Sequence, residues 1–77
     1  MNNNRREQIC SIANKLHECC LDLESVRDDE DYTRENMPSS LQNNDSYQDS
    51  ETCSYIISDA IDSINQAAGD LESIINK

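Results

Sequence analysis

The sequence predicts an all-α protein, an antiparallel hairpin of two long helices. Two segments of the 77-residue chain repeat apolar residues every three or four positions, which is the spacing of an amphipathic helix. A Met37-Pro38 pair separates the segments, and proline ends a helix because it lacks the amide donor and restricts the residue before it. A chain this short forms at most one small domain. We therefore expect a single domain over residues 1–77, with helices at about 4–36 and 46–76 and a turn at about 37–45.

The stretch from residue 50 to residue 75 carries the clearest helical stripe. Written as heptads abcdefg, it is apolar at positions a, d and e, a face about 100° wide. That width exceeds the seam of a two-stranded coiled coil, which uses two positions per heptad. The stripe consists of Ile57, Ile64 and Leu71 at a, Cys53, Ala60, Ala67 and Ile74 at d, and Ile61, Ala68 and Ile75 at e.

The first half of the chain repeats this pattern. Asparagines at its start offer N-cap oxygens, and Ser46 with Asp49, or Asp45 with Gln48, forms a capping box for the second helix. With the turn centred near Leu41, small residues of one helix face large residues of the other, so the helices approach closely. The first stripe consists of Ile9, Leu16 and Leu23 at a, Ile12, Cys19 and Val26 at d, and Ala13 and Cys20 at e.

A two-helix hairpin cannot cover stripes this wide, because each helix has only the other as a neighbour. We expect further copies of the chain to cover the e positions. The simplest arrangement is a two-fold dimer that forms a four-helix bundle, and a larger helical oligomer is the alternative. The residues expected at this interface between copies are Ala13, Cys20, Ile56, Ile61, Ala68 and Ile75.

The cysteines predict neither a disulfide nor a metal site. The four contain no Cys-x-x-Cys pair. In the expected register, Cys20 and Cys53 differ in height by roughly 13 Å, whereas a disulfide needs alpha carbons within about 7 Å. We expect Cys19, Cys20 and Cys53 to be small core residues. His17 lies near Cys20 on the helix, but two ligands do not complete a tetrahedral site.

The sequence also lacks a catalytic constellation. The consecutive acids at 28–31 fan around a helix axis rather than converging as a general acid and base must. A single glycine excludes a phosphate-binding loop. We therefore predict a protein that is not an enzyme and has no catalytic residue, metal or cofactor.

The charge balance limits the class of partner. Six basic and sixteen acidic residues give a formal net charge of −10. Such a chain repels nucleic acid and anionic membranes and suits a basic protein surface. The start of the chain does not read as a signal peptide, and no apolar run reaches the roughly 18 residues of a membrane span. We expect a cytoplasmic protein that binds neither nucleic acid nor membrane.

The predicted hairpin tip, residues 27–42, combines an arginine, a run of acids, a tyrosine and a Met-Pro-x-x-Leu-Gln turn. The tip resembles that of small bacteriophage and prophage proteins in which the same elements join two amphipathic helices. This resemblance implies a phage protein that acts in the host cytosol, and the small size and acidic charge then suggest a counter-defence protein. The matching residues are Arg27, Asp28, Asp29, Glu30, Asp31, Tyr32, Met37, Pro38, Leu41 and Gln42.

Three functions remain open. The chain could inhibit a host defence protein by stoichiometric binding through the acidic residues Glu18, Asp22, Asp28, Asp29, Asp31 and Glu35. It could instead be an oligomeric sponge that holds an anionic signalling nucleotide through guanidinium, aromatic and amide groups. The third possibility is a purely structural or assembly hairpin. The predicted binding site at the tip consists of Arg27, Glu30, Tyr32, Arg34, Asn36, Gln42 and Tyr47.

Within the tip, we expect different roles for the aromatic and the basic side chains. Tyr32, with Met37 and Leu41, is expected to pack against the end of the bundle. Arg27 and Arg34 are expected to bind the ligand or partner.

Overall fold

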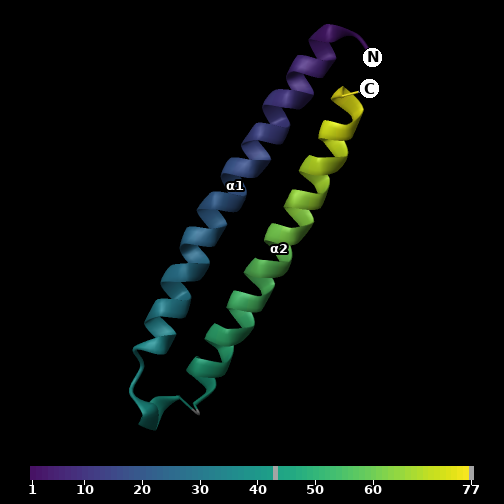
Figure 1. Ribbon diagram of the computed structural model, residues 1–77. Coiled ribbons are helices and arrows are strands. Elements are labelled where there is room, and N and C mark those ends of the chain that lie inside the picture. The colour runs from purple at the N-terminus through teal and green to yellow at the C-terminus, as the bar shows by residue number, and fades with distance from the viewer. Residues whose placement is uncertain (43, 77) are drawn as a thin grey trace.

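The computed structural model confirms the all-α helical hairpin (Figure 1). Helix α1 spans Asn3–Glu35, a short 3₁₀ turn η1 spans Ser39–Leu41, and helix α2 spans Asp45–Ile75. Both long helices begin and end within one residue of the positions expected from the sequence. The structure describes residues 1–42 and 44–76. Position 43 of the predicted turn and position 77 of the predicted domain lie outside the described residues.

Asparagine caps begin both long helices. The Asn2 side-chain oxygen accepts a hydrogen bond from the Arg5 backbone N–H at 2.9 Å, and the Asn44 oxygen accepts one from the Tyr47 N–H at 2.9 Å. Each bond satisfies one of the amide donors that a helix leaves unpaired in its first turn. The cap of α2 is thus Asn44 rather than the expected Asp45 or Ser46, because Asn44 is the last residue with an extended backbone.

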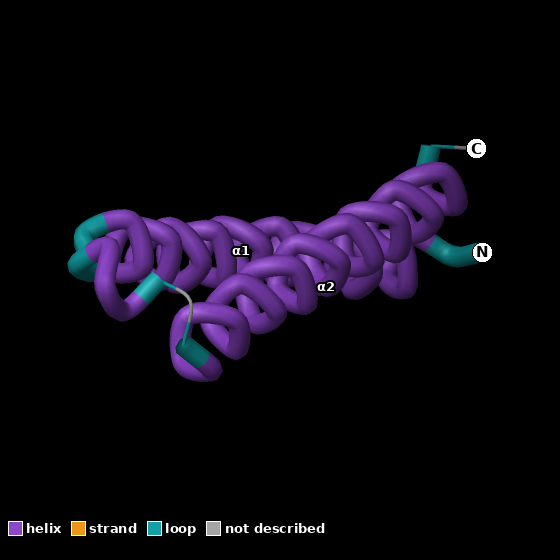
Figure 2. The backbone as a smooth tube through the Cα atoms, turned by 90° about the horizontal axis from the view of Figure 1, so that it is seen from below, coloured by secondary structure: helices purple, strands orange, loops and turns teal. Residues whose placement is uncertain are grey.

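The molecule is a rod only two helices wide. Its principal extents are 60 × 14 × 13 Å. Figures 1 and 2 show α1 and α2 side by side along their length, with both termini at the end opposite the turn. Each long helix therefore packs against one neighbour, and only a narrow seam between the two is shielded from water.

The seam uses heptad positions a and e. Along α1 it runs through Ile9, Ala13, Leu16, Cys20 and Leu23, which alternate between half-buried and buried. Along α2 the corresponding residues are Ile57, Ile61, Ile64, Ala68, Leu71 and Ile75. The most deeply buried apolar residues among those described are small or medium in size, namely Ala13, Cys20, Ile61 and Ala68. The Cys20 thiol lies 3.7 Å from the Ile61 carbonyl oxygen, which shows how closely the backbones approach.

This seam corrects the expected interface between copies. Ala13, Cys20, Ile61 and Ala68 are buried inside one hairpin, so they offer no surface to a second copy. Of the other two, Ile75 is half-buried in the seam and Ile56 is 62% exposed. Positions a and d and positions a and e both alternate in steps of three and four residues, so periodicity alone does not choose between them.

The d positions consequently face solvent, except that Ala60 is half-buried. Cys19 and Cys53 are exposed, which corrects their expected place in the core, while Cys20 is buried as expected. All four cysteines are free thiols. The remaining exposed d residues are Ile12, Val26, Ala67 and Ile74.

The seam assignment predicts different effects of truncation at Ile61 and Leu21. Ile61→Ala should lower the free energy of unfolding by about 2–5 kcal/mol, because it opens a cavity between the helices. Leu21 is 65% exposed, so Leu21→Ala should change this free energy by less than about 0.5 kcal/mol. Urea unfolding followed by circular dichroism, at one fixed protein concentration, measures both. Equal effects would contradict the a and e seam.

Candidate functional site

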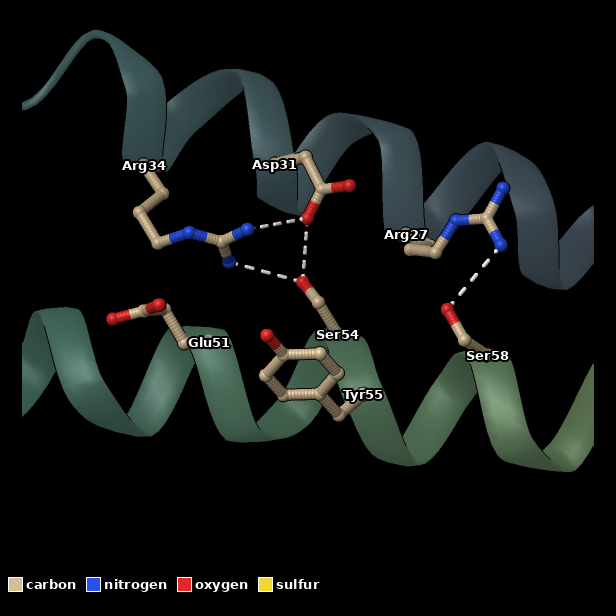
Figure 3. Close-up of a pocket in the computed structure, with 7 residues that line it drawn as sticks. All are labelled: Arg27, Asp31, Arg34, Glu51, Ser54, Tyr55 and Ser58. Atoms are coloured by element: carbon tan, nitrogen blue, oxygen red, sulfur yellow. Dashed lines mark hydrogen bonds and ion pairs between the residues drawn. The ribbon is translucent and has the colours of Figure 1, made fainter.

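The seam changes from apolar to polar toward the tip. Beyond Leu23 and Ile57, the same heptad positions carry charged and hydroxyl side chains instead of aliphatic ones. Figure 3 shows α1 side chains in this half of the seam pointing across to serines of α2. The residues that form the cross-helix polar contacts are Arg27, Asp31 and Arg34 on α1 and Ser50, Ser54 and Ser58 on α2.

Four of these residues form a closed network, which we call the polar lock: Asp31, Arg34, Ser50 and Ser54. Arg34 Nη1 donates to Ser50 Oγ and Ser54 Oγ, both at 3.0 Å, and Arg34 Nη2 donates to Asp31 Oδ1 at 2.7 Å. Ser54 Oγ donates to the same Asp31 oxygen at 2.6 Å. The Arg34 side chain is only 14% exposed. The lock therefore joins the two helices through hydrogen bonds that are largely protected from solvent.

The polar lock keeps its two ionisable groups charged. The hydrogen bond from Ser54, together with the Arg34 guanidinium, holds the pKa of the Asp31 carboxyl below its ordinary value. The hydrogen bond to Asp31 in turn raises the pKa of Arg34. These shifts agree in direction, because each charged partner favours the ionised form of the other.

Beside the lock lies a hollow of about 180 Å³. Arg27 Nη1 donates to Ser58 Oγ at 3.3 Å, and Arg27 Nη2 lies 3.5 Å from Asp28 Oδ1. Two guanidinium groups border the hollow, but so do the carboxylates of Asp31 and Glu51. The positive charge is thus balanced locally. The lining residues are Arg27, Asp31, Arg34, Glu51, Ser54, Tyr55 and Ser58.

The structure brings together some of the predicted tip residues and separates others. Arg27 and Arg34 border one hollow. Asn36 and Gln42 instead tie down the turn, through Asn36 Nδ2 to the Tyr32 carbonyl at 2.8 Å and Gln42 Nε2 to the Met37 carbonyl at 3.2 Å. Of the other three predicted residues, Glu30 and Tyr47 are half-buried at the seam positions of their helices, and Tyr32 is exposed.

The structure contradicts the packing role expected for Tyr32, and it gives Arg34 a packing role as well as a place at the hollow. Tyr32 is 70% exposed and Leu41 is also exposed, so neither packs against the end of the hairpin as expected, whereas Met37 is half-buried. Arg34 instead supplies the packing, because its side chain lies between the helices in the polar lock. An arginine can fill such a position, since its aliphatic stem packs while the guanidinium donates.

The serines of α2 and Tyr55 were not among the predicted site residues, although Ser50 and Ser54 lie in the predicted stripe of residues 50–75. Ser50 and Ser54 take heptad positions a and e, in phase with the apolar stripe that follows them, and Ser58 comes four residues later at position b. That phase is the signal that could have revealed them, since small hydroxyl side chains in line with a seam face the partner helix. Tyr55 is as exposed as Tyr32, at 70%, and lies beside the hollow.

Titratable side chains also lie on the rest of the rod, away from the tip. Near the termini, His17 Nε2 lies 2.5 Å from Glu72 Oε1 and links α1 to α2. Burial raises the pKa of the Cys20 thiol, and Glu24 and Cys19 add to the shift. Among residues 1–42 and 44–76, no three histidine, cysteine, aspartate or glutamate side chains are grouped to hold a metal ion. Over the same part of the chain, neither long helix is apolar over enough of its length to cross a bilayer.

Fold and site together define an antiparallel helical hairpin with a half-apolar, half-polar seam. Comparison with protein-family models, with curated proteins and with solved structures gives no match.

The polar lock predicts a pH-dependent effect of Asp31→Asn. At pH 7 this substitution should lower the melting temperature, because it removes the charge that Arg34 and Ser54 contact. The pKa of Asp31 is lowered in the folded state, so its stabilisation is present above the ordinary carboxyl value, about 3.9, and is lost as the pH falls through the lower folded value. The difference between variant and native protein should therefore shrink toward pH 3 in thermal scans by circular dichroism.

Asp28→Asn is the matched control for this prediction. The Asp28 side chain is 70% exposed and its contact with Arg27 is long, at 3.5 Å. Exposed pairs of this kind contribute little, so the control should melt like the native protein at every pH. A similar loss in both variants would show that net charge, rather than the polar lock, sets the effect.

Proposed function

We propose that this chain is a non-enzymatic binding protein that attaches stoichiometrically to a basic surface of another protein. Its resemblance to small phage proteins makes a host defence protein in the bacterial cytosol the proposed target, which the chain would inhibit. The mechanism requires no catalytic group, because an inhibitor of this kind acts by occupying a surface.

The observation that carries this proposal is two exposed tyrosines among acids, at heptad position c of α1 and position f of α2, which are the outer sides of these helices. Tyr32 on α1 and Tyr55 on α2 lie near the polar lock, and each is 70% exposed. Tyrosine is enriched in protein interfaces because it buries a large, rigid surface and keeps a polar end. The neighbouring exposed acids would steer a basic partner to the tip. These acids are Asp28, Asp29, Glu35, Asp45 and Asp49.

The polar lock supports this proposal by making the tip rigid. Arg34 contacts Ser50 and Ser54 across the seam, so the last turns of α1 and the first turns of α2 are held together. A rigid surface loses less conformational freedom on binding than a mobile one, which favours affinity. The tyrosines would therefore be presented in a fixed arrangement.

The proposed binding unit is a homo-oligomer. No large side chain among the described residues is fully buried within one chain. Folding has to offset a conformational entropy cost of about 1–2 kcal/mol per residue, mostly by burial of apolar surface. A single hairpin with so little buried surface is therefore expected to gain stability from further copies.

An anionic nucleotide remains a second candidate ligand. The observation in its favour is the hollow that Arg27 and Arg34 border together. The carboxylates of Asp31 and Glu51 border the same hollow, and a bound phosphate would have to compete with Asp31 for Arg34. This balance of charge makes the protein partner our preferred proposal.

The double variant Tyr32→Ala/Tyr55→Ala tests the proposed tip surface. The immobilised native protein should capture one defined protein from a bacterial lysate at a fixed molar ratio, measured by native mass spectrometry. The double variant should lose this capture while keeping its melting temperature, because neither ring is buried. Leu21→Ala, which removes an equally exposed apolar side chain away from the tip, should retain capture.

A thermal shift assay with cyclic nucleotides separates the alternatives. We expect no shift. A ligand at a hundred times its dissociation constant would stabilise the fold by about 2.7 kcal/mol. Such a shift, absent in Arg27→Ala, would replace the inhibitor proposal with the nucleotide sponge. Absence of both capture and shift would favour a purely structural hairpin.

A further inference from the structure

The hairpin has one polar face and one apolar face. In an antiparallel helix pair, equivalent heptad positions of the two helices lie on the same side. His17 and Glu72 share position b, and their contact marks one side of the rod as polar. The d positions lie on the other side of each helix. We call this side the apolar face, with ridges formed by Ile12, Cys19 and Val26 on α1 and by Ala60, Ala67 and Ile74 on α2.

The apolar face is continuous across both helices. Half-buried seam residues such as Leu16 and Ile64 lie between the two ridges and extend the apolar surface into the groove. The contacts of Cys20 with Ile61 and of Arg27 with Ser58 fix the register. The ridge residues therefore pair at similar heights as three layers, which are Ile12 with Ile74, Cys19 with Ala67, and Val26 with Ala60.

Charge indicates how two apolar faces can meet. Residues 27–51 contain eight acids and two arginines, so the tip is strongly acidic. Near the termini, α1 carries Arg5, Arg6 and Lys15, which balance the acids around them. Two hairpins with their tips together would bring like charges together. Two antiparallel hairpins instead place the basic start of each α1 beside the acidic tip of the other copy.

We infer that a second copy of this chain covers the apolar face, with the two hairpins antiparallel about a two-fold axis near Cys19. The small Cys19 and Ala67 layers then face each other at the centre, and the layer of Ile12 faces the layer of Val26 from the partner copy. This inference rests on the homo-oligomer of the proposed function. It adds which face the two copies share and how they are oriented.

The antiparallel arrangement also pairs charges at the rim of the face. Lys15 and Asp22 are exposed and lie one heptad apart on the same edge of α1. With the axis midway between them, Lys15 of each copy lies beside Asp22 of the other. The rod is 60 Å long and its apolar layers run through its middle, so the two copies overlap along most of their length. A lengthwise overlap of this kind suits a stable isologous interface.

Light scattering on Val26→Glu and Leu21→Glu tests this interface. The native protein should have twice the 8.8 kDa mass of one chain at micromolar concentration. Val26→Glu places a charge on the apolar face and should give the single-chain mass. Leu21→Glu places the same charge on the outer side of α1 and should leave the dimer intact. A native protein of single-chain mass would overturn the inference.

Cross-linking tests the orientation without disturbing the interface. In a Cys10→Ser/Cys53→Ser background, Cys19 is the exposed thiol, and a short bis-maleimide should join Cys19 to Cys19 of the second copy. In a Cys10→Ser/Cys19→Ser background, the two Cys53 thiols would lie about 40 Å apart, given 1.5 Å of rise per residue. No cross-link should then form. Joining through Cys53 would place the tips together and contradict the antiparallel dimer.

These outcomes separate the dimer from the proposed target. An antiparallel dimer that captures no protein would retain the inference and remove the inhibitor function. A single-chain protein that still captures a target through Tyr32 and Tyr55 would retain the inhibitor function and overturn the dimer.

Charge exchange adds a check on the antiparallel orientation. Lys15→Glu and Asp22→Lys should each weaken the dimer, whereas the double variant should restore it.

Discussion

Each helix of this hairpin has one neighbour, and most features of the molecule follow from that constraint. A helix pair shields a narrow seam, whereas the apolar stripes of this chain are three heptad positions wide. The seam takes positions a and e, where Ala13, Cys20 and Ala68 are small enough for the backbones to approach closely. The d positions are left in solvent, so the rod acquires an apolar face opposite its polar one.

The polar lock addresses a different requirement, which is register. Aliphatic side chains at equivalent heights can slide past one another by a heptad with modest cost, but a guanidinium bonded to two defined serine oxygens of the other helix cannot. Buried polar groups are best attested in this role, where they fix pairing rather than add stability. Arg34 contacts Ser50 and Ser54, and Ser54 contacts Asp31, in one alignment of the helices. The apolar half of the seam therefore supplies most of the attraction, and the polar half sets the alignment.

Sequence reasoning reached the architecture because the relevant signals are local. Helical periodicity, the Met37-Pro38 break and the matched lengths of the two segments do not depend on tertiary contacts. The choice of face does depend on them. Steps of three and four residues describe both candidate stripes, and the burial of Ala13, Cys20, Ile61 and Ala68 in the folded hairpin selects between them. The site was partly predicted for the same reason, since Arg27 and Arg34 stand out in sequence, whereas the position of a serine in the stripe does not show which charged residue it contacts.

The division of the seam also bears on how the chain folds. Contacts near the turn close the shortest loops, and the bond from Arg34 to Ser50 spans 16 residues. In the apolar half, the contact of the buried Cys20 thiol with the Ile61 carbonyl oxygen spans 41 residues, and that of His17 with Glu72 spans 55. Loop-closure entropy grows with this separation, so the chain meets its polar contacts before its hydrophobic ones. The turn thus nucleates with little hydrophobic stabilisation, and the barrier to folding is expected to lie where the seam first becomes apolar.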